Sequence, residues 1–324
     1  MNPCRSVIRV CHLIAAAALL AAPVPALAYP AGIVPADARQ ADKPILVQVI
    51  IPQVEVRLPI AGAGGGGEAQ GGIVGALIVG AMDASKQKKV QDAAEPIRIA
   101  LEDFSADPVA MEATRKAFGA LPWVKIADGA PSRNPTMRAG SALLDRAPGA
   151  HAATLTYQYM INPGYTGASV IATIAMAAKD NPKAKTPEKR WLPERLSYRN
   201  SVSVSVSLSN MAATEEERQK QWGANDGALA RAVLSKALNK AAELAARSMA
   251  LTAVDLLSLN AKDRPKTTAG FVKGRIVEGG ENIATPATSN ALVRMSATVK
   301  PDTDGLLVWA DFFLHMSAVT APNP

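Results

Sequence analysis

The chain has 324 residues, of which 48% are apolar and 19% charged, with two cysteines, three histidines and a formal net charge of +7. This amount of apolar material can fill one large core or two modest ones, which excludes a wholly disordered or collagen-like chain. The mean hydropathy is +0.07, and no apolar run reaches roughly 18 residues, which argues against a multi-span membrane protein.

Residues 1–28 have the order of a secretory signal peptide. Arg5 and Arg9 precede the apolar stretch 13–20, and an Ala-Leu-Ala sequence ending at Ala28 offers a small-residue cleavage site. We therefore expect removal of this segment near Ala28 and a periplasmic or secreted location.

Both cysteines lie in the segment that is expected to be removed, so the mature chain should contain neither a disulfide nor a thiolate metal site. The mature chain keeps 33 Lys and Arg against 28 Asp and Glu, a net charge of +5. Its histidines, His151 and His315, are far apart and have no second ligand at helical spacing, so no metal is expected. The basic residues are spread out without interleaved aromatics, so no nucleic-acid partner is expected.

Residues 29–44 are rich in alanine and proline without periodicity, which predicts an extended leader. Dense β-branched residues over 45–58 predict the first strand. Pro52 has no amide hydrogen and predicts an edge, a bulge or a break between two short strands. The α/β domain that begins with this strand is expected to extend to residue 258.

A glycine-rich loop is predicted over 62–72, followed by a helix of small residues over 71–84. The loop matches the GxGxxG pattern, but almost any spacing occurs in so dense a glycine run, and no Lys-Ser/Thr follows, so no nucleotide cofactor is expected. Glycine and alanine recur along the helix and form a smooth strip that suits a close neighbour. The strip consists of Gly71, Gly72, Gly75, Ala76, Gly80 and Ala84.

Three environments remain open for the helix over 71–84: packing inside the domain, self-association or partner docking, and membrane insertion. Its continuous apolar part, residues 73–82, would measure about 15 Å, which is half of a hydrocarbon core. Any membrane contact is therefore expected to be peripheral.

Helices and strands alternate in the next part of the chain. Pro96 predicts a kink or a break in the first helix, and Asp107-Pro108 and Asn134-Pro135 are typical of helix starts. The predicted elements are a helix over 86–104, a helix over 108–118, a short strand over 123–127 and a short helix from Asn134 toward Arg146.

Three strands are predicted next, over 153–161, 170–178 and 196–208. The third gives the clearest pattern in the chain, because valine alternates with serine from Ser201 to Ser209. One face should be buried and the other wet, as in an antiparallel sheet. The basic connection 179–195 is interpreted as a solvated hairpin loop, with contact to lipid or a polyanion as the alternative.

A capping box at Thr214 and Glu217 predicts a helix start, and the alanine-rich pattern over 226–257 predicts a long amphipathic helix. A β-hairpin-rich C-terminal appendage is predicted over 267–315. Its expected strands and turns are 271–277, the turn at Gly279-Gly280, 291–299, the turn at Asp304-Gly305 and 306–313.

No catalytic residues are assigned. The chain has no GxSxG elbow, and His151 lies at a predicted strand entrance without an identified base partner, so we interpret it as structural. The carboxylate clusters Glu102-Asp103 and Glu215–Glu217 are interpreted as solubilising charge on exposed helical turns.

Three stretches of the mature chain carry information beyond composition: GGIVGALIVGAMDASKQKKVQDAAEPIRIALEDF, RWLPERLSYRNSVSVSVSL and WGANDGALARAVL. Together with the signal peptide, they resemble an uncharacterised family of secreted proteins of Gram-negative bacteria. This resemblance implies export but no assigned activity and no site residues. The element order is also similar to that of the small periplasmic domain of outer-membrane accessory lipoproteins, although the lipidation cysteine is missing here.

These patterns predict an α/β or α+β fold in which a mixed, partly antiparallel sheet is covered by helices and followed by the β-rich C-terminal appendage. The leading hypothesis for function is an exported, non-enzymatic envelope protein that acts through protein-protein contact or self-association. The alternatives are a secreted hydrolase with a serine or carboxylate site and a protein that binds a lipid or small ligand.

Overall fold

The computed structural model describes most of the predicted α/β domain and several C-terminal strands. The described residues are 33–56, 58, 95–208, 212–252 and 255, and five short segments between 266 and 315. The predicted signal peptide, glycine-rich loop and small-residue helix lie outside these residues. Of the helices that are described, none combines the length and the apolar run needed to cross a bilayer.

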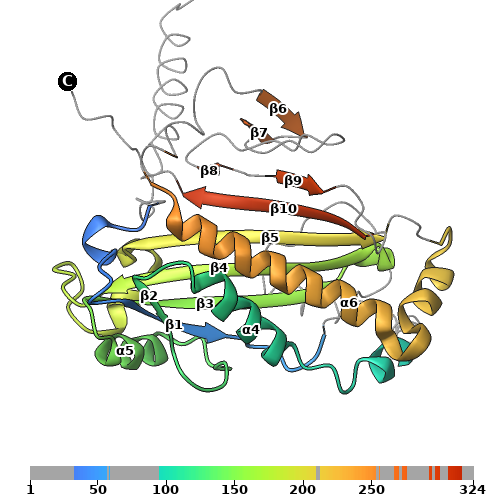
Figure 1. Cartoon of the computed structure of the whole chain (residues 1–324), viewed down its shortest axis with the longest axis horizontal. Helices are drawn as coiled ribbons and strands as arrows, with labels where there is room; N and C mark the ends of the chain where they lie inside the picture. The colour runs from blue at the N-terminus through green and yellow to red at the C-terminus, as the bar shows by residue number, and fades with distance from the viewer. Residues whose placement is uncertain are drawn as a thin grey trace, which may run out of the picture.

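A mixed β-sheet forms the body of the molecule (Figure 1). Its main strands are β1 (Ile45–Ile50), β2 (Val124–Ile126), β3 (His151–Ile161), β4 (Gly167–Ala178), β5 (Tyr198–Leu208) and β10 (Leu306–His315). They lie in the order β2-β1-β3-β4-β5-β10. β1 is parallel to β2 and to β3, whereas each neighbouring pair from β3 to β10 is antiparallel. The predicted α/β class with a mixed, partly antiparallel sheet is confirmed.

The last strand of the predicted C-terminal appendage continues this sheet. β10 pairs with β5 from Leu306 opposite Leu208 to Leu314 opposite Asn200. The short strands β8 (Leu292–Val293) and β9 (Ser296–Val299) pair with the other side of β10. A separate two-stranded sheet contains β6 (Lys266–Ala269) and β7 (Val272–Arg275). The C-terminal β content is therefore divided between two sheets.

The alternating pattern of β5 has the expected physical basis. The side chains of Val202, Val204 and Val206 are fully buried, whereas the intervening serines are only half-buried. Full burial of a valine side chain stabilises the fold by about 1.5–3 kcal/mol, so a slip of one residue in register would expose this whole apolar row.

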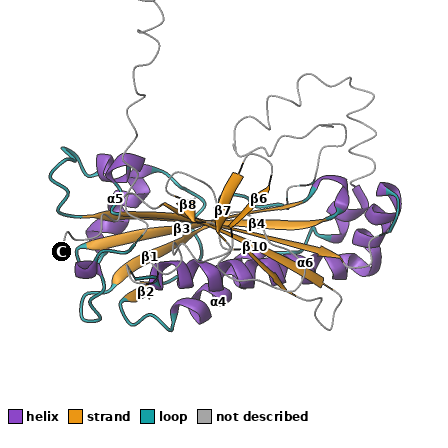
Figure 2. Ribbon diagram, turned by 90° about the horizontal axis from the view of Figure 1, so that it is seen from above, coloured by secondary structure: helices purple, strands orange, loops and turns teal. Residues whose placement is uncertain are grey.

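Helices cover the two faces of the sheet unequally (Figure 2). They are α4 (Ala106–Phe118), α5 (Met137–Arg146) and α6 (Glu215–Ala250). α4 and α6 pack on one face and bury the main core. α5 lies on the other face, where it covers a smaller core together with the short 3-10 helix η6 (Glu188–Trp191).

The helix α6 is interrupted close to the start of the predicted helix 226–257, and it ends earlier than predicted. The Thr214–Glu217 capping box is present, but the helix is interrupted at residues 224–227, where Asn225, Asp226 and Gly227 have positive φ angles. At Gly227 a Cβ atom would lie 3.1 Å from the Ala100 carbonyl oxygen, so only glycine fits this close approach without strain.

The predicted helix end at residue 257 was wrong, because the helix ends at Ala250. Arg39 donates hydrogen bonds to the carbonyl oxygens of Met249, Ala250 and Leu251 at 3.2, 3.2 and 2.5 Å. These acceptors belong to the last turn and its cap, where carbonyls have no partner within the helix. A side chain from the N-terminal segment therefore caps the helix, which the local pattern of α6 could not show.

Candidate functional site

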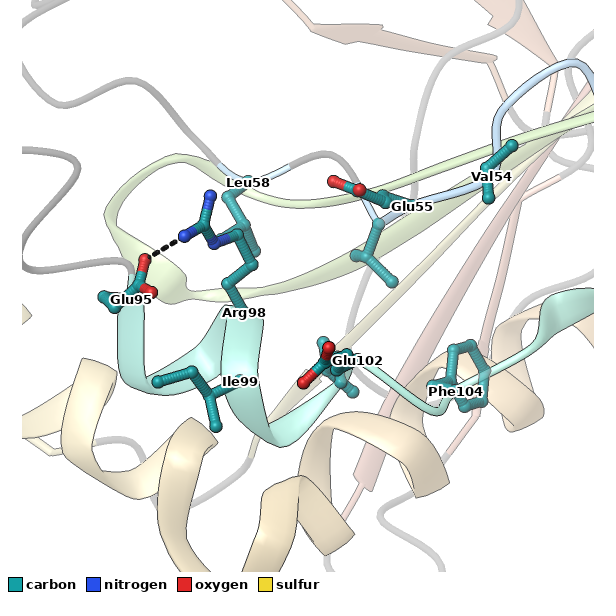
Figure 3. A pocket seen from close by; sticks show the side chains of 10 residues that line it. Val54, Glu55, Leu58, Glu95, Arg98, Ile99, Glu102 and Phe104 are labelled. Carbon is teal, nitrogen blue, oxygen red and sulfur yellow. Dashed lines mark ion pairs between the residues drawn. The ribbon is translucent and has the colours of Figure 1, made fainter.

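A groove opens beside the helical turn 95–100, where the chain segment that follows β1 passes this turn (Figure 3). We call it the acidic groove. Its volume is about 370 Å³. The groove is lined by Val54, Glu55, Val56, Leu58, Glu95, Arg98, Ile99, Leu101, Glu102 and Phe104.

One wall of the groove is positioned by Gln53. The strand β1 ends at Ile50, shorter than the predicted 45–58, because Pro52 cannot donate a backbone hydrogen bond. The buried Gln53 side chain then pairs with β3 as a backbone amide would. Its Nε2 donates to the Tyr159 carbonyl at 2.8 Å, and its Oε1 accepts from the Tyr159 amide at 3.2 Å. Residues 54–58 leave the sheet from this anchor.

Arg133 holds the same segment from the opposite side. Its guanidinium donates to the carbonyl oxygens of Ile51 and Gln53 at 2.8 and 2.9 Å, and to the Asp107 carboxylate at 2.6 Å. Charge-assisted hydrogen bonds are about twice as strong as neutral ones. The start of the wall is therefore fixed, although it is irregular in backbone conformation.

The other wall, residues 95–104, is anchored to the helices behind it. Ile97 is completely buried and Leu101 is nearly so. Arg231 of α6 donates to the Ala100 carbonyl at 2.6 Å and pairs with Asp103. This hydrogen-bonded pair is the main cause that holds the pKa of Asp103 below its ordinary value.

Two exposed apolar side chains lie in the groove. Val54 is 73% exposed and Ile99 is 61% exposed. In the described part of the chain, the only other large apolar side chain with such exposure is Met137 on α5. Ile99 also lines a second hollow of about 720 Å³ between the turn 95–104 and the interruption of α6. The turn therefore forms a ridge with a hollow on each side.

Among the described residues that line the acidic groove, carboxylates surround a single guanidinium. Arg98 extends from the helical turn toward Leu58 and pairs with Glu95 at 2.5 Å (Figure 3). The hydrogen bond that Arg98 donates to Glu95 is the main cause that raises the pKa of Arg98, and the charges of Glu95, Glu55 and Glu102 add to it. Three carboxylates against one guanidinium give the described lining residues a net negative charge.

The residue types in the groove suit the binding of a ligand better than the catalysis of a covalent reaction. An apolar side chain of a ligand can cover Val54 and Ile99, while a cationic group can approach Glu55 and Glu102, which are both exposed. Among the described residues, no group of three or more His, Cys, Asp or Glu side chains is arranged to hold a metal ion. The described residues that line the groove include no histidine, serine or cysteine.

The residues that the sequence singled out are only partly placed by the structure. Gly71, Gly72, Gly75, Ala76, Gly80 and Ala84 lie outside the described residues. The two carboxylate clusters interpreted as solubilising charge, Glu102-Asp103 and Glu215–Glu217, are brought to the same end of the sheet, because Gly223 of α6 packs against Pro96. Glu102 then faces a groove, which sequence separation concealed.

His151 begins β3 and is 5% exposed. Burial lowers the pKa of its imidazole, and the charges of Asp37 and Asp180 oppose that effect. Among the hydrogen bonds of the described residues, none joins this ring to a serine hydroxyl. This environment favours the structural interpretation of His151.

Hydroxyl groups line part of the sheet face that α5 leaves uncovered. Ser169 donates to Asn162 at 2.6 Å and to Ser205 at 3.2 Å, and Asn162 donates to Ser205 at 3.1 Å. On the same strands, Thr173 and Ser201 are 3.1 Å apart. These groups hydrogen-bond one another, so the row of serines stabilises the wet face.

Comparison with known proteins gives no relative for this chain. No protein family, curated protein or solved structure matches it.

Proposed function

We propose that this protein is a non-enzymatic binding protein of the cell envelope that acts through contact of the acidic groove with another polypeptide. The partner segment would present an apolar side chain next to lysine or arginine. The observation that carries the proposal is the coincidence, in one groove, of the exposed Val54 and Ile99 with the carboxylates of Glu55 and Glu102.

Physical chemistry supports this partner class. Scattered single apolar side chains on a surface need no explanation, but two in one hollow provide apolar area that a ligand can remove from water. Carboxylates at the rim give charge complementarity, which selects basic partners and raises the rate of encounter. The anchors Gln53, Arg133 and Arg231 hold both walls, so little ordering is required on binding.

The proposed location in the envelope rests on the N-terminal sequence. Residues 1–28 combine a basic start, an apolar stretch and a small-residue end, which is the order of a secretory signal. Growth of the producing cells followed by fractionation and N-terminal sequencing tests this part: a mature end near Tyr29 is expected, and a retained N-terminus would contradict export.

A peptide of defined chemistry tests the groove directly. We expect a fluorescent peptide of alternating leucine and lysine to bind the purified protein, as measured by fluorescence anisotropy, and a leucine-glutamate peptide of equal length not to bind. The Val54→Ser/Ile99→Ser double variant should bind the first peptide about tenfold more weakly, because both apolar contacts are lost.

Met137 provides a matched control, since it is the third large apolar side chain that is exposed among the described residues but lies on α5. Met137→Ser should leave peptide binding unchanged. Equal binding of both peptides, or undiminished binding by the double variant, would overturn the assignment of this groove.

A further inference from the structure

The described charges are distributed unevenly along the molecule. We define the acidic end as Glu55, the turn 95–104 and residues 214–231. The last two segments are joined by contacts of Gly223 with Pro96 and of Arg231 with Ala100. It holds eight acidic and four basic residues. The acidic residues are Glu55, Glu95, Glu102, Asp103, Glu215, Glu216, Glu217 and Asp226, and the basic ones are Arg98, Arg218, Lys220 and Arg231.

The opposite balance occurs on α5 and the connection 179–195, which we call the basic end. Its basic residues are Arg138, Arg146, Lys179, Lys183, Lys185, Lys189, Arg190 and Arg195, and its acidic ones are Asp145, Asp180, Glu188 and Glu194. The two parts are one surface because η6 packs on α5, where the Trp191 ring covers Gly140.

Few of these basic groups are engaged within the chain. Lys179 donates to the Ala147 carbonyl at 2.8 Å, whereas Lys183, Lys185 and Lys189 are exposed. The buried Arg190 Nε has no hydrogen-bond partner among the described residues. No ion pair between described residues involves the connection 179–195, so its positive charge remains available to a partner.

The two ends lie at opposite ends of the long axis of the molecule (Figure 1). β3 and β4 connect them. His151 and Ala178 pair at the basic end, and Ile161 and Ala168 pair near the acidic end. An antiparallel strand rises about 3.4 Å per residue, so the 11 residues of β3 separate the two surfaces by roughly 35 Å. One molecule therefore cannot neutralise its own ends by direct contact.

From this arrangement we infer that the partner of the acidic groove is the basic end of a second copy of the same chain. This inference rests on the proposed function and identifies the partner that occupies the acidic groove. The connection 179–195 combines exposed lysines with the partly exposed Leu192, the chemistry that the groove requires. Because the two surfaces differ, the contact is head-to-tail, and it generates chains or rings of molecules rather than a symmetric dimer.

Charge reversal at each end tests this inference by sedimentation velocity on the purified whole protein. The acidic-end variant is Glu55→Lys/Glu102→Lys, and the basic-end variant is Lys185→Glu/Lys189→Glu. The unmodified protein should sediment faster as its concentration rises, and less so at high salt, since exposed charges are screened. Each variant should associate at least about tenfold more weakly, because close like charges oppose docking.

Mixing separates head-to-tail contact from other modes of association. In an equimolar mixture of the two variants, the intact basic end of one meets the intact acidic end of the other, and the two reversed ends also carry opposite charges, so the mixture should associate as its concentration rises although neither variant does so alone. A protein with all four charges reversed should associate with itself again. Arg115→Glu/Lys116→Glu in the last turn of α4 is the matched control and should behave as the unmodified protein, because both side chains are exposed and belong to neither end.

Several outcomes would overturn the inference. These are a protein that stays monomeric at high concentration, a mixture of the two variants that does not associate, and a control that weakens association as much as the end variants. Binding of phosphatidylglycerol vesicles that depends on Lys185 and Lys189, without self-association, would assign the basic end to a membrane instead. If the peptide still binds the groove in that case, the proposed function stands and only the identity of the partner fails.

Discussion

Replacement of Arg39 by methionine is expected to lower the free energy of unfolding by about 3 kcal/mol. The guanidinium of Arg39 joins the N-terminal segment to the end of α6. It contacts the carbonyls of residues 249–251 and the Val34 carbonyl, the last at 3.3 Å, and lies 5.3 Å from the centre of the Trp123 ring. Methionine keeps the apolar stem but removes every one of these polar contacts.

The magnitude follows from the half-buried position of Arg39. A hydrogen bond to a charged group contributes about 1.5–3 kcal/mol, but the four bonds share one charge, and water can replace part of them after substitution. The positive charge at the helix C-terminus adds about 0.5–1 kcal/mol, and the cation–π contact a similar amount. A total near 3 kcal/mol is therefore smaller than the sum of separate bonds.

Urea unfolding followed by circular dichroism measures this change by linear extrapolation. Arg39→Lys keeps the charge but cannot contact three consecutive carbonyls with one planar group, so it should lose about half as much. The exposed Arg115 on α4 serves as control, and Arg115→Met should change stability by less than about 0.5 kcal/mol. An equally small change for Arg39→Met would refute the capping role.

Further substitutions test other contacts of the fold. Gln53→Leu should cost about 2–4 kcal/mol in urea unfolding, because the buried amide and carbonyl of Tyr159 lose their partner; an unchanged midpoint would contradict the strand-like role of Gln53. Gly140→Ala should cost about 1–3 kcal/mol, since the new Cβ would lie 2.6 Å from the Trp191 ring, and full stability would show that the ring moves aside freely. Burial raises the pKa of Tyr198 to about 12, so the folded state binds this proton more tightly than the unfolded state. The contribution of Tyr198 to stability should be complete below pH of about 10 and decrease as the pH rises toward about 12. Ultraviolet titration of the protein against its Tyr198→Phe variant should show this tyrosine ionising late, and ionisation near pH 10 would contradict its burial.

The strands with period-two patterns were predictable because their alternation reports burial directly. The predicted strand 196–208 corresponds to β5, in which Val202, Val204 and Val206 are buried. The place of β10 beside β5 was not predictable in the same way, since an alternating strand specifies which face is buried but does not identify its neighbour.

The acidic groove was less accessible to sequence reasoning because long-range contacts assemble it. Its walls come from residues 54–58 and 95–104 and are held by Gln53 and Arg231 from other parts of the chain. One local signal was present: Ile99 does not share the helical spacing of Ile97, Leu101 and Phe104 in the sequence, and the structure shows it exposed. An apolar residue on the wrong face of a predicted helix therefore marked the site.

Hydrogen-deuterium exchange of the purified protein, at low and high concentration and with the leucine-lysine peptide, is the most direct test of the central claim. The account predicts that peptide binding slows exchange at residues 53–56 and 95–104. At high concentration the same segments and the connection 179–195 should both slow, while α4 stays unchanged. Protection confined to another surface, such as the hydroxyl-lined face of β4 and β5, would contradict the assignment of the acidic groove as the contact site.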